Sequence, residues 1–300
     1  MKPALIFAIA LCGAALAAAQ APKTNHPPPL LVYPRQLPPP ATAAPPPEMQ
    51  WLYGSGEAAA ASIQAYRLFR DYAVAAARHR PKDSVVIAED STLPNPSFVP
   101  CGKKPLAVVL DVDETALLNI GYEYDQAAQH RPYDPKRWSD WERTGVGAVR
   151  PVPGAVVALK AVRAAGIKVI FNSNRSAENA TYSELALDGA GLGPARHLKE
   201  LFVTGDTPGG SAKDVRRALI ARRYCVVAMA GDQLGDFSDL FNSANPPIFW
   251  RRETTMAGKI AQMWGNGWFV LPNPVYGTGV RGNFDDVFPF YRWSDPAGGQ

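Results

Sequence analysis

Cysteine and histidine are scarce in this sequence, with three cysteines and four histidines among 300 residues. The histidines (His26, His79, His130 and His197) are dispersed and show no metal-ligand spacing. A zinc site built from cysteine and histidine is therefore not expected, and the sequence has no histidine nucleophile motif. We interpret His130 as a solvated surface residue.

Dense basic charge is missing as well. The net charge is +4, and no basic run is longer than a pair such as Arg222-Arg223 or Arg251-Arg252. Nucleic-acid-binding proteins usually carry a dense basic patch, so we expect no nucleic-acid polymer as a partner. The small positive balance suits an anionic substrate but identifies none, and the oligomeric state stays open.

The apolar run Ala4–Leu16 is too short to cross a bilayer comfortably. It follows Lys2 and precedes three alanines, an order typical of a cleavable secretory signal. We predict a signal peptide over residues 1–19, cleaved before Gln20. The mature protein is then periplasmic or secreted, without stable membrane insertion.

Export changes the interpretation of the cysteines. Leu11 precedes Cys12 where a lipoprotein signal would have a small residue, so we do not expect lipidation. Cys101 and Cys225 remain after cleavage, in a compartment that permits disulfides. Each lies at or just before the start of an apolar, strand-like run. Two alternatives stay open, a Cys101–Cys225 bridge and two buried free thiols.

Residues 20–50 are rich in proline and include three Pro-Pro-Pro runs. Such a segment lacks many backbone donors and is extended, so we interpret it as a linker. Recognition of the proline motifs by a partner is the alternative. The folded domain is expected over residues 51–300.

Beyond the linker, apolar runs alternate with helical patterns. Glu57–Arg78 has apolar residues at helical intervals and ends before Pro81. Later, strand, helix and strand alternate, which indicates an α/β fold with a doubly wound parallel sheet. The expected strands are Leu106–Leu110, Ile167–Phe171, Leu201–Val203 and Cys225–Ala230, and the expected helices between them are Val152–Ala165 and Ser211–Arg223.

Polar residues follow the strands directly, where such sheets bind their ligands. Asp111 and Asp113 follow the first strand, and because they are separated by one residue their carboxylates project the same way. One carboxylate is then placed to attack phosphorus and the other to transfer a proton. Ser173 follows the second strand, in position to bind a phosphoryl oxygen.

Two acids follow the last strand, and a lysine precedes it. Asp232 and Asp236 would join Asp111 as hard oxygen ligands, which favours Mg²⁺ as the cofactor. Lys213 would neutralise the crowded carboxylates and the transferring phosphoryl group.

These groups resemble, in order, the four motifs of the haloacid dehalogenase (HAD) superfamily. Closer features resemble the class C bacterial acid phosphatases, over about Trp51 to Gly277. The matching segments are Gln64-Ala65-Tyr66, Asp111-Val112-Asp113-Glu114-Thr115, Ser173-Asn174-Arg175, Ser211-Ala212-Lys213, Arg216-Arg217, Gly231-Asp232-Gln233-Leu234-Gly235-Asp236-Phe237, Leu271-Pro272-Asn273-Pro274 and Tyr276-Gly277.

The resemblance implies that Asp111 is the nucleophile and Asp113 the general acid and base. It also implies that Asp111, the backbone carbonyl of Asp113 and Asp232 hold Mg²⁺, with Asp236 supporting. Activity at acid pH follows only from the resemblance. Two positions depart from the family: Gln233 replaces a usual asparagine, and Leu118 replaces a frequent aspartate, which bears on metal support and on the substrate pocket.

The segment from about 117 to 150 is too long for a plain connection and resembles the small, mainly helical cap of this superfamily. We expect Trp138 and Trp141 in the cap's own core, because their spacing puts them on one helix face. Tyr122 is expected to face substrate. By resemblance, so is Tyr276, and we also place Asn174 and Arg175 among the substrate-binding residues.

The sequence thus predicts a phosphoric monoester hydrolase, and aromatic residues beside the phosphate site favour nucleoside 5′-monophosphates among small phosphomonoesters. Three alternatives remain. A phosphotransferase would use the same residues, a binding or storage protein would not need Asp111 and Asp113, and a haloacid dehalogenase would not need Asp113 or the metal carboxylates.

Overall fold

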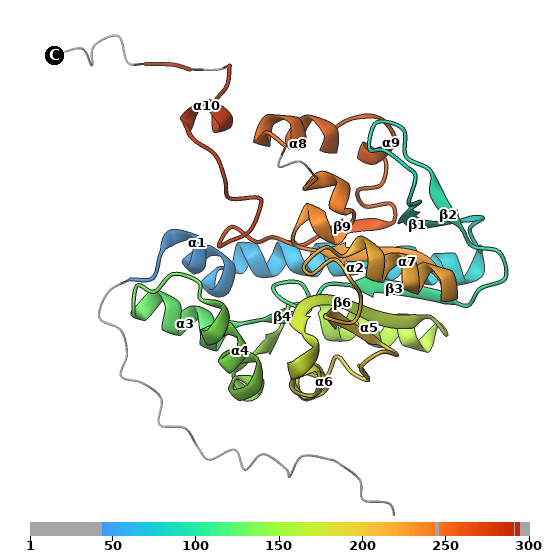
Figure 1. Cartoon of the computed structure of the whole chain (residues 1–300), viewed down its shortest axis with the longest axis horizontal. Coiled ribbons are helices and arrows are strands. Elements are labelled where there is room, and N and C mark those ends of the chain that lie inside the picture. The colour runs from blue at the N-terminus through green and yellow to red at the C-terminus, as the bar shows by residue number, and fades with distance from the viewer. Residues whose placement is uncertain (1–43, 244–245, 291, 295–300) are drawn as a thin grey trace, which may run out of the picture. The chain divides into compact units, whose positions relative to one another are not determined.

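The computed structural model describes residues 44–243, 246–290 and 292–294 (Figure 1). The described residues all belong to one compact unit. The expected signal peptide, its cleavage point, Cys12 and most of the expected linker lie outside the described residues. Within the described part, no helix is both long enough and apolar enough to cross a membrane.

A parallel five-stranded sheet forms the centre of the folded unit, in the order β7-β6-β3-β8-β9. Ala107 and Val109 of β3 pack on one side and Val108 and Leu110 on the other, all buried. Burial on both faces explains the continuous apolar runs, and the expected α/β fold is confirmed. The strands are β3 (Leu106–Leu110), β6 (Lys168–Ser176), β7 (Leu201–Thr204), β8 (Cys225–Gly231) and β9 (Trp268–Val270).

Three helices cover one face of the sheet: α2 (Gly56–Arg78), α5 (Ala155–Ala164) and α6 (Ala180–Gly189). Helix α2 begins where the Ser55 hydroxyl accepts a bond from the Ala58 amide at 3.0 Å. Tyr66, Phe69 and Ala73 recur at helical spacing on α2 and are fully buried against the sheet.

The other face is covered by one helix, a hairpin and short helical turns. Trp268 of β9 is fully buried here, its ring 5.4 Å from that of Phe237 and 6.4 Å from that of Phe241. The elements are α7 (Asp214–Arg223), the antiparallel β1 (Asp83–Ile87) and β2 (Phe98–Pro100), η4 (Leu234–Asp236), η5 (Asp239–Phe241) and α9 (Gly258–Ala261).

The segment between β3 and α5 leaves the sheet and returns at one place, because β4 (Leu117–Leu118) and β5 (Arg150–Pro151) pair antiparallel. Between them lie α3 (Ile120–Ala128), α4 (Pro135–Thr144) and η2 (Val146–Ala148), near the end of the sheet (Figure 1). We refer to residues 117–151 as the cap.

Four further short elements lie near the two ends of the described chain and after η5: α1 (Pro47–Met49), the π-helical turn η1 (Gln50–Gly54), α8 (Ile248–Thr255) and α10 (Phe284–Val287). Met49 is already buried. The packed structure therefore begins a few residues before the expected start of the domain.

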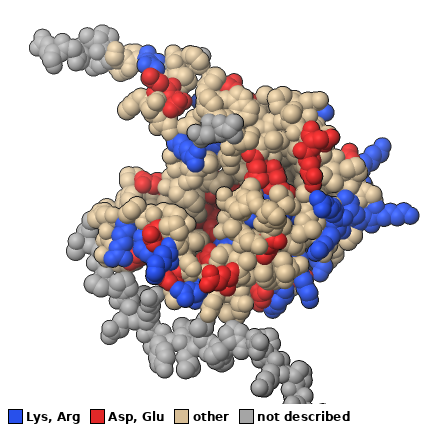
Figure 2. All heavy atoms as spheres, viewed as in Figure 1, with Lys and Arg blue, Asp and Glu red and all other residues tan. Residues whose placement is uncertain are grey.

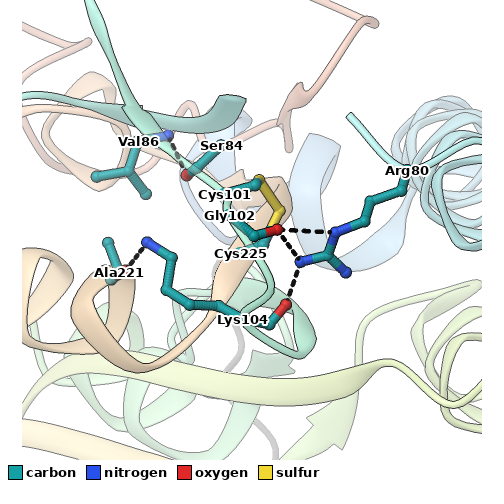
Figure 3. Close-up of a disulfide and its surroundings, with 8 residues drawn as sticks. All are labelled: Arg80, Ser84, Val86, Cys101, Gly102, Lys104, Ala221 and Cys225. Atoms are coloured by element: carbon teal, nitrogen blue, oxygen red, sulfur yellow. Dashed lines mark hydrogen bonds between the residues drawn. A yellow bond between two sulfur atoms is a disulfide. The ribbon is translucent and has the colours of Figure 1, made fainter. Parts of the chain in front are cut away.

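Of the two alternatives for the cysteines, the structure has the bridge (Figure 3). Cys101 follows β2, Cys225 is the first residue of β8, and their Cα atoms lie 4.6 Å apart. The chain is held on both sides, since Cys101 N donates to Lys82 O and Cys225 N donates to Pro105 O. The bridge therefore ties the β1–β2 hairpin to the start of a central strand.

Replacing Cys101 and Cys225 together with serine should lower the free energy of unfolding by about 3–5 kcal/mol, because the bond closes a long loop in the unfolded chain. Urea unfolding of the oxidised protein and of the double variant measures the difference. Reductant should destabilise the parent protein and leave the variant unchanged. Equal stability of the two oxidised proteins would contradict the prediction.

Candidate active site

The predicted catalytic residues meet at the carboxyl ends of β3 and β8. The chain order reverses between these two strands, because β3 is followed outward by β6 and β7 and the chain then returns to β8. Asp111 N donates to Ala230 O at 3.0 Å, which fixes the two strand ends to each other. On the face seen in Figure 2, a recess has acidic side chains in its depth.

Three carboxylates and one ammonium group occupy this strand edge. Oxygen atoms of Asp111, Asp232 and Asp236 all lie within 4.8 Å of one another. Lys213 Nζ lies 2.7 Å from Asp111 Oδ1 and 2.6 Å from Asp236 Oδ1, and the lysine side chain is 6% exposed. The structure thus brings together residues from three separate segments of the chain: Asp111, Lys213, and Asp232 with Asp236.

The electrostatics of this group call for a further cation. Burial raises the pKa of Asp111 well above its usual range, against the effect of Lys213 and with the help of Asp236 and Asp232. Burial, helped by Asp236, also raises the pKa of Asp232 to about 6. Burial alone would lower the pKa of Lys213, but Asp111 and Asp236 outweigh it and the pKa is raised to about 12. Three carboxylates against one ammonium, with hard oxygen donors only, fit a divalent cation such as Mg²⁺.

Asp232 is oriented by three donors. Thr115 Oγ1 donates to Asp232 Oδ1 at 2.9 Å. Gln233 Nε2 and Asn273 Nδ2 both donate to Asp232 Oδ2, each at 2.9 Å. The carboxylate is therefore held in one orientation by residues from three segments.

Asp113 is held by a buried arginine and an asparagine. Arg175 Nη2 lies 2.8 Å and Arg175 Nε 3.0 Å from Asp113 Oδ1, and Asn119 Nδ2 donates to the same atom at 2.9 Å. Arg175 is 1% exposed and was expected to bind substrate, but here its guanidinium contacts the proposed acid. The Asp113 side chain keeps 15% of its surface exposed, toward solvent or a ligand.

Ser173 and Asn174 lie in β6, at the irregularity where its register with β7 shifts between Asn172 and Ser176. Ser173 Oγ accepts a bond from Arg175 N at 3.1 Å and lies 3.5 Å from Asp113 Oδ2. Asn174 is exposed, and its Oδ1 accepts a bond from Arg216 Nη2 at 2.6 Å. Ser173 thus lies beside Asp113, the proposed acid, and the exposed Asn174 is held in place by the buried Arg216.

Tyr276 reaches the site through Glu114. The Tyr276 hydroxyl donates to Glu114 Oε2, and the Tyr53 hydroxyl donates to Glu114 Oε1 at 3.2 Å. Burial, together with the charge of Asp113, raises the pKa of Glu114 to about 8. The Glu114 backbone has φ of +50°, an uncommon conformation for this residue type, so the chain reverses sharply after Asp113.

Tyr122 lies in the core of the cap. It is 4% exposed, and its ring lies 5.1 Å from that of Trp138 and 6.1 Å from that of Trp141. Trp138 and Trp141 have the packing role expected of them. Tyr122, on α3, shares this role, because its ring packs against the two tryptophans of α4 and the Arg137 guanidinium lies over it, 5.2 Å from the ring centre. The ring therefore presents no open face to a substrate in this structure.

Several residues of the site were not assigned from the sequence: Thr115, Asn119, Asn273, Tyr53 and Arg216. Thr115 and Asn273 lie inside the motifs that carry the family resemblance, so their position in those motifs could have indicated that they belong to the site. Asn119 was noted only as the residue after Leu118, with no role assigned to it. Tyr53 gave no local signal, because its contact with Glu114 spans 61 positions.

Comparisons with known proteins agree with this geometry. The family model described as HAD superfamily, subfamily IIIB (acid phosphatase), matches residues 58–279. The structure of the class C acid phosphatase from Bacillus anthracis is 22% identical with a TM-score of 0.62, covering 77% of this chain and 84% of that one. The class C acid phosphatase from Bacillus anthracis with tungstate bound is 21% identical with a TM-score of 0.63, covering 83% of this chain and 90% of that one. At this identity the likeness shows the fold.

The raised pKa values of Glu114 (about 8) and Asp232 (about 6) predict how metal-free stability depends on pH. The folded state keeps protons that the unfolded chain releases above about pH 4, so the stability that these two groups contribute should be larger at pH 5 than at pH 8. Urea midpoints in EDTA at pH 5 and pH 8 measure this. Glu114→Gln should flatten the decrease, and greater stability at pH 8 than at pH 5 would contradict it.

Proposed function

The chain belongs to subfamily IIIB of the HAD superfamily, the acid phosphatases, and from this premise we propose that it is a Mg²⁺-dependent hydrolase acting through an aspartyl-phosphate. The observation that carries the proposal is the convergence of Asp111, Asp232 and Asp236 around Lys213, with Asp113 held apart by Arg175. This separates the carboxylate cluster proposed to bind the metal from Asp113, whose carboxyl group lies outside the cluster and is proposed to transfer protons.

In the first step, a carboxylate oxygen of Asp111 attacks the phosphorus of the monoester. The bond between phosphorus and the ester oxygen breaks, and Asp113 gives its proton to the departing oxygen. Lys213 offsets the charge of Asp111 and of the phosphoryl group, and Ser173 would donate to a phosphoryl oxygen. A bound Mg²⁺ would be held by Asp111, Asp232 and Asp236 and would neutralise phosphoryl charge.

In the second step, Asp113 takes a proton from water as the water oxygen attacks the phosphorus. The bond between phosphorus and Asp111 breaks, inorganic phosphate leaves, and both carboxyl groups return to their starting states. Arg175 and Asn119 keep Asp113 in one orientation for both proton transfers.

For the substrate we propose small phosphomonoesters, with nucleoside 5′-monophosphates among them. Tungstate in the Bacillus anthracis structure is a tetrahedral oxyanion, which supports a phosphate-sized site on this fold. The support for a nucleotide is weaker than the sequence suggested, because Tyr122 is enclosed in the cap and the Tyr276 hydroxyl is bonded to Glu114. The predicted export remains part of the proposal, and the Cys101–Cys225 bridge supports it.

Asp111→Asn should lower phosphate release from p-nitrophenyl phosphate at least about a thousandfold, because the nucleophile is lost. EDTA should abolish the parent activity, and added Mg²⁺ should restore it. Asp90→Asn, at an exposed residue between β1 and β2, is the control and should leave the rate unchanged. A fully active Asp111→Asn variant would overturn the mechanism.

Asp113→Asn should slow hydrolysis by about 10²–10⁴. Because water is no longer activated, the phosphorylated enzyme should accumulate with an activated leaving group such as p-nitrophenol. Intact-protein mass spectrometry after rapid quenching detects the added phosphoryl group on Asp111. Absence of any phosphorylated species, with the slow rate retained, would exclude Asp113 from the second step.

The ratio of rates on 5′-AMP and on p-nitrophenyl phosphate tests the nucleotide preference. A kcat/KM at least tenfold higher for 5′-AMP would support it, and equal values would indicate broad specificity. Added glycerol separates hydrolysis from transfer, because a phosphotransferase forms glycerol phosphate while a hydrolase releases inorganic phosphate.

A further inference from the structure

The side-chain amide of Gln233 bridges the carboxylate site and the segment 273–278. Its Nε2 donates to Asp232 Oδ2 at 2.9 Å and to Tyr276 O at 3.2 Å. Its Oε1 accepts from Thr278 N at 2.9 Å and from Thr278 Oγ1 at 3.2 Å. All the polar capacity of this amide is therefore used between one acid and one loop.

The Gln233 side-chain amide binds the backbone of residues 276–278 as the peptide group of a neighbouring strand would. Tyr276 O and Thr278 N lie two residues apart, and a single amide satisfies both, as a neighbouring peptide group would. Gly277 lies between them with φ of +99°, and a Cβ there would lie 2.4 Å from Gln233 Oε1. The glycine thus leaves the space that the glutamine amide occupies.

The backbone of Gln233 contacts the second carboxylate. Gln233 N donates to Asp236 Oδ2 at 2.8 Å, so one residue binds both Asp232 and Asp236. The other donor to Asp232 Oδ2, Asn273, comes from the same loop, and its Oδ1 accepts from Val275 N at 3.0 Å. Asp232 and the loop are consequently fixed by a shared set of bonds.

We propose that Gln233 is a positioning residue that couples the metal affinity of Asp232 to the conformation of residues 273–278, including Tyr276. Held by Thr115, Gln233 and Asn273, the Asp232 carboxylate keeps the orientation in which it faces Asp111 and Asp236. Asparagine, which the family usually has here, is one methylene shorter and would not span from Asp232 to Thr278. The inference rests on the proposed function only in that Asp232 binds Mg²⁺.

The test is calorimetric titration of Mg²⁺ into metal-free protein, comparing Gln233→Met with Gln262→Met. The first keeps the side-chain length and removes both hydrogen-bonding atoms, and the second makes the same change at an exposed residue at the end of α9. Gln233→Met should weaken Mg²⁺ binding about 10–100-fold. Gln262→Met should bind as the parent does.

Amide hydrogen exchange distinguishes a local effect on the loop 273–278 from a general loss of stability. In the parent protein, Mg²⁺ should slow exchange at the Thr278 amide, and in Gln233→Met this metal-dependent protection should be lost while the exchange of β3 amides stays slow. Gly277→Ala is a second route to the same result if Gln233→Met fails to fold, because its Cβ would displace the glutamine amide.

The outcomes separate the two proposals. If the parent protein binds no Mg²⁺, the proposed metal dependence fails. If the parent binds Mg²⁺ and Gln233→Met or Gly277→Ala binds it within twofold of the parent, only the coupling through Gln233 fails. Weakened binding with unchanged protection of Thr278 would also overturn the coupling.

Discussion

The contact of Lys213 with two carboxylates at once is the constraint on which the site depends. One ammonium group lies between Asp111 and Asp236, so the end of β3 and the loop after β8 must meet at the start of α7. The backbone reinforces this arrangement, because Lys213 N donates to Asp239 Oδ1 at 3.0 Å. Arg217, one turn later on α7, donates to Asp236 O at 2.7 Å. Helix α7, the end of β3 and the loop after β8 therefore hold one another in position. Lys213 supplies one positive charge against three carboxylates, so the cluster keeps an excess of negative charge.

The fold was largely predictable, because burial on both faces makes β3, β6 and β8 into plain apolar runs. The chemistry-bearing residues followed from the rule that ligands bind at the carboxyl ends of such strands. The β1–β2 hairpin and β9 were not predicted. Their strands are short, and Trp268 is recognisable as a core residue only once Phe237 and Phe241 are packed against it.

Within the site, identity was more predictable than orientation. Arg175 was expected to bind substrate because it lies in a motif at a strand end, and its motif is indeed at the site. Its guanidinium nevertheless pairs with Asp113, which offsets the cost of burying the arginine charge. Tyr122 likewise could not be placed from spacing alone. Its neighbours Trp138 and Trp141 come from another helix. How α3 and α4 pack depends on both helices together and cannot be predicted from the spacing of residues within one of them.

The Cys101–Cys225 bond also divides the proposed catalytic residues between two parts of the chain. The 124-residue separation encloses Asp111, Asp113 and Lys213, while Asp232 lies beyond it. The stretch 129–136 inside this covalent ring is exposed, as a site of proteolytic cleavage would be. A single cut there would leave both fragments joined by sulfur, so the nicked protein would migrate as one species until it is reduced. A preparation judged intact without reductant can therefore contain a broken cap.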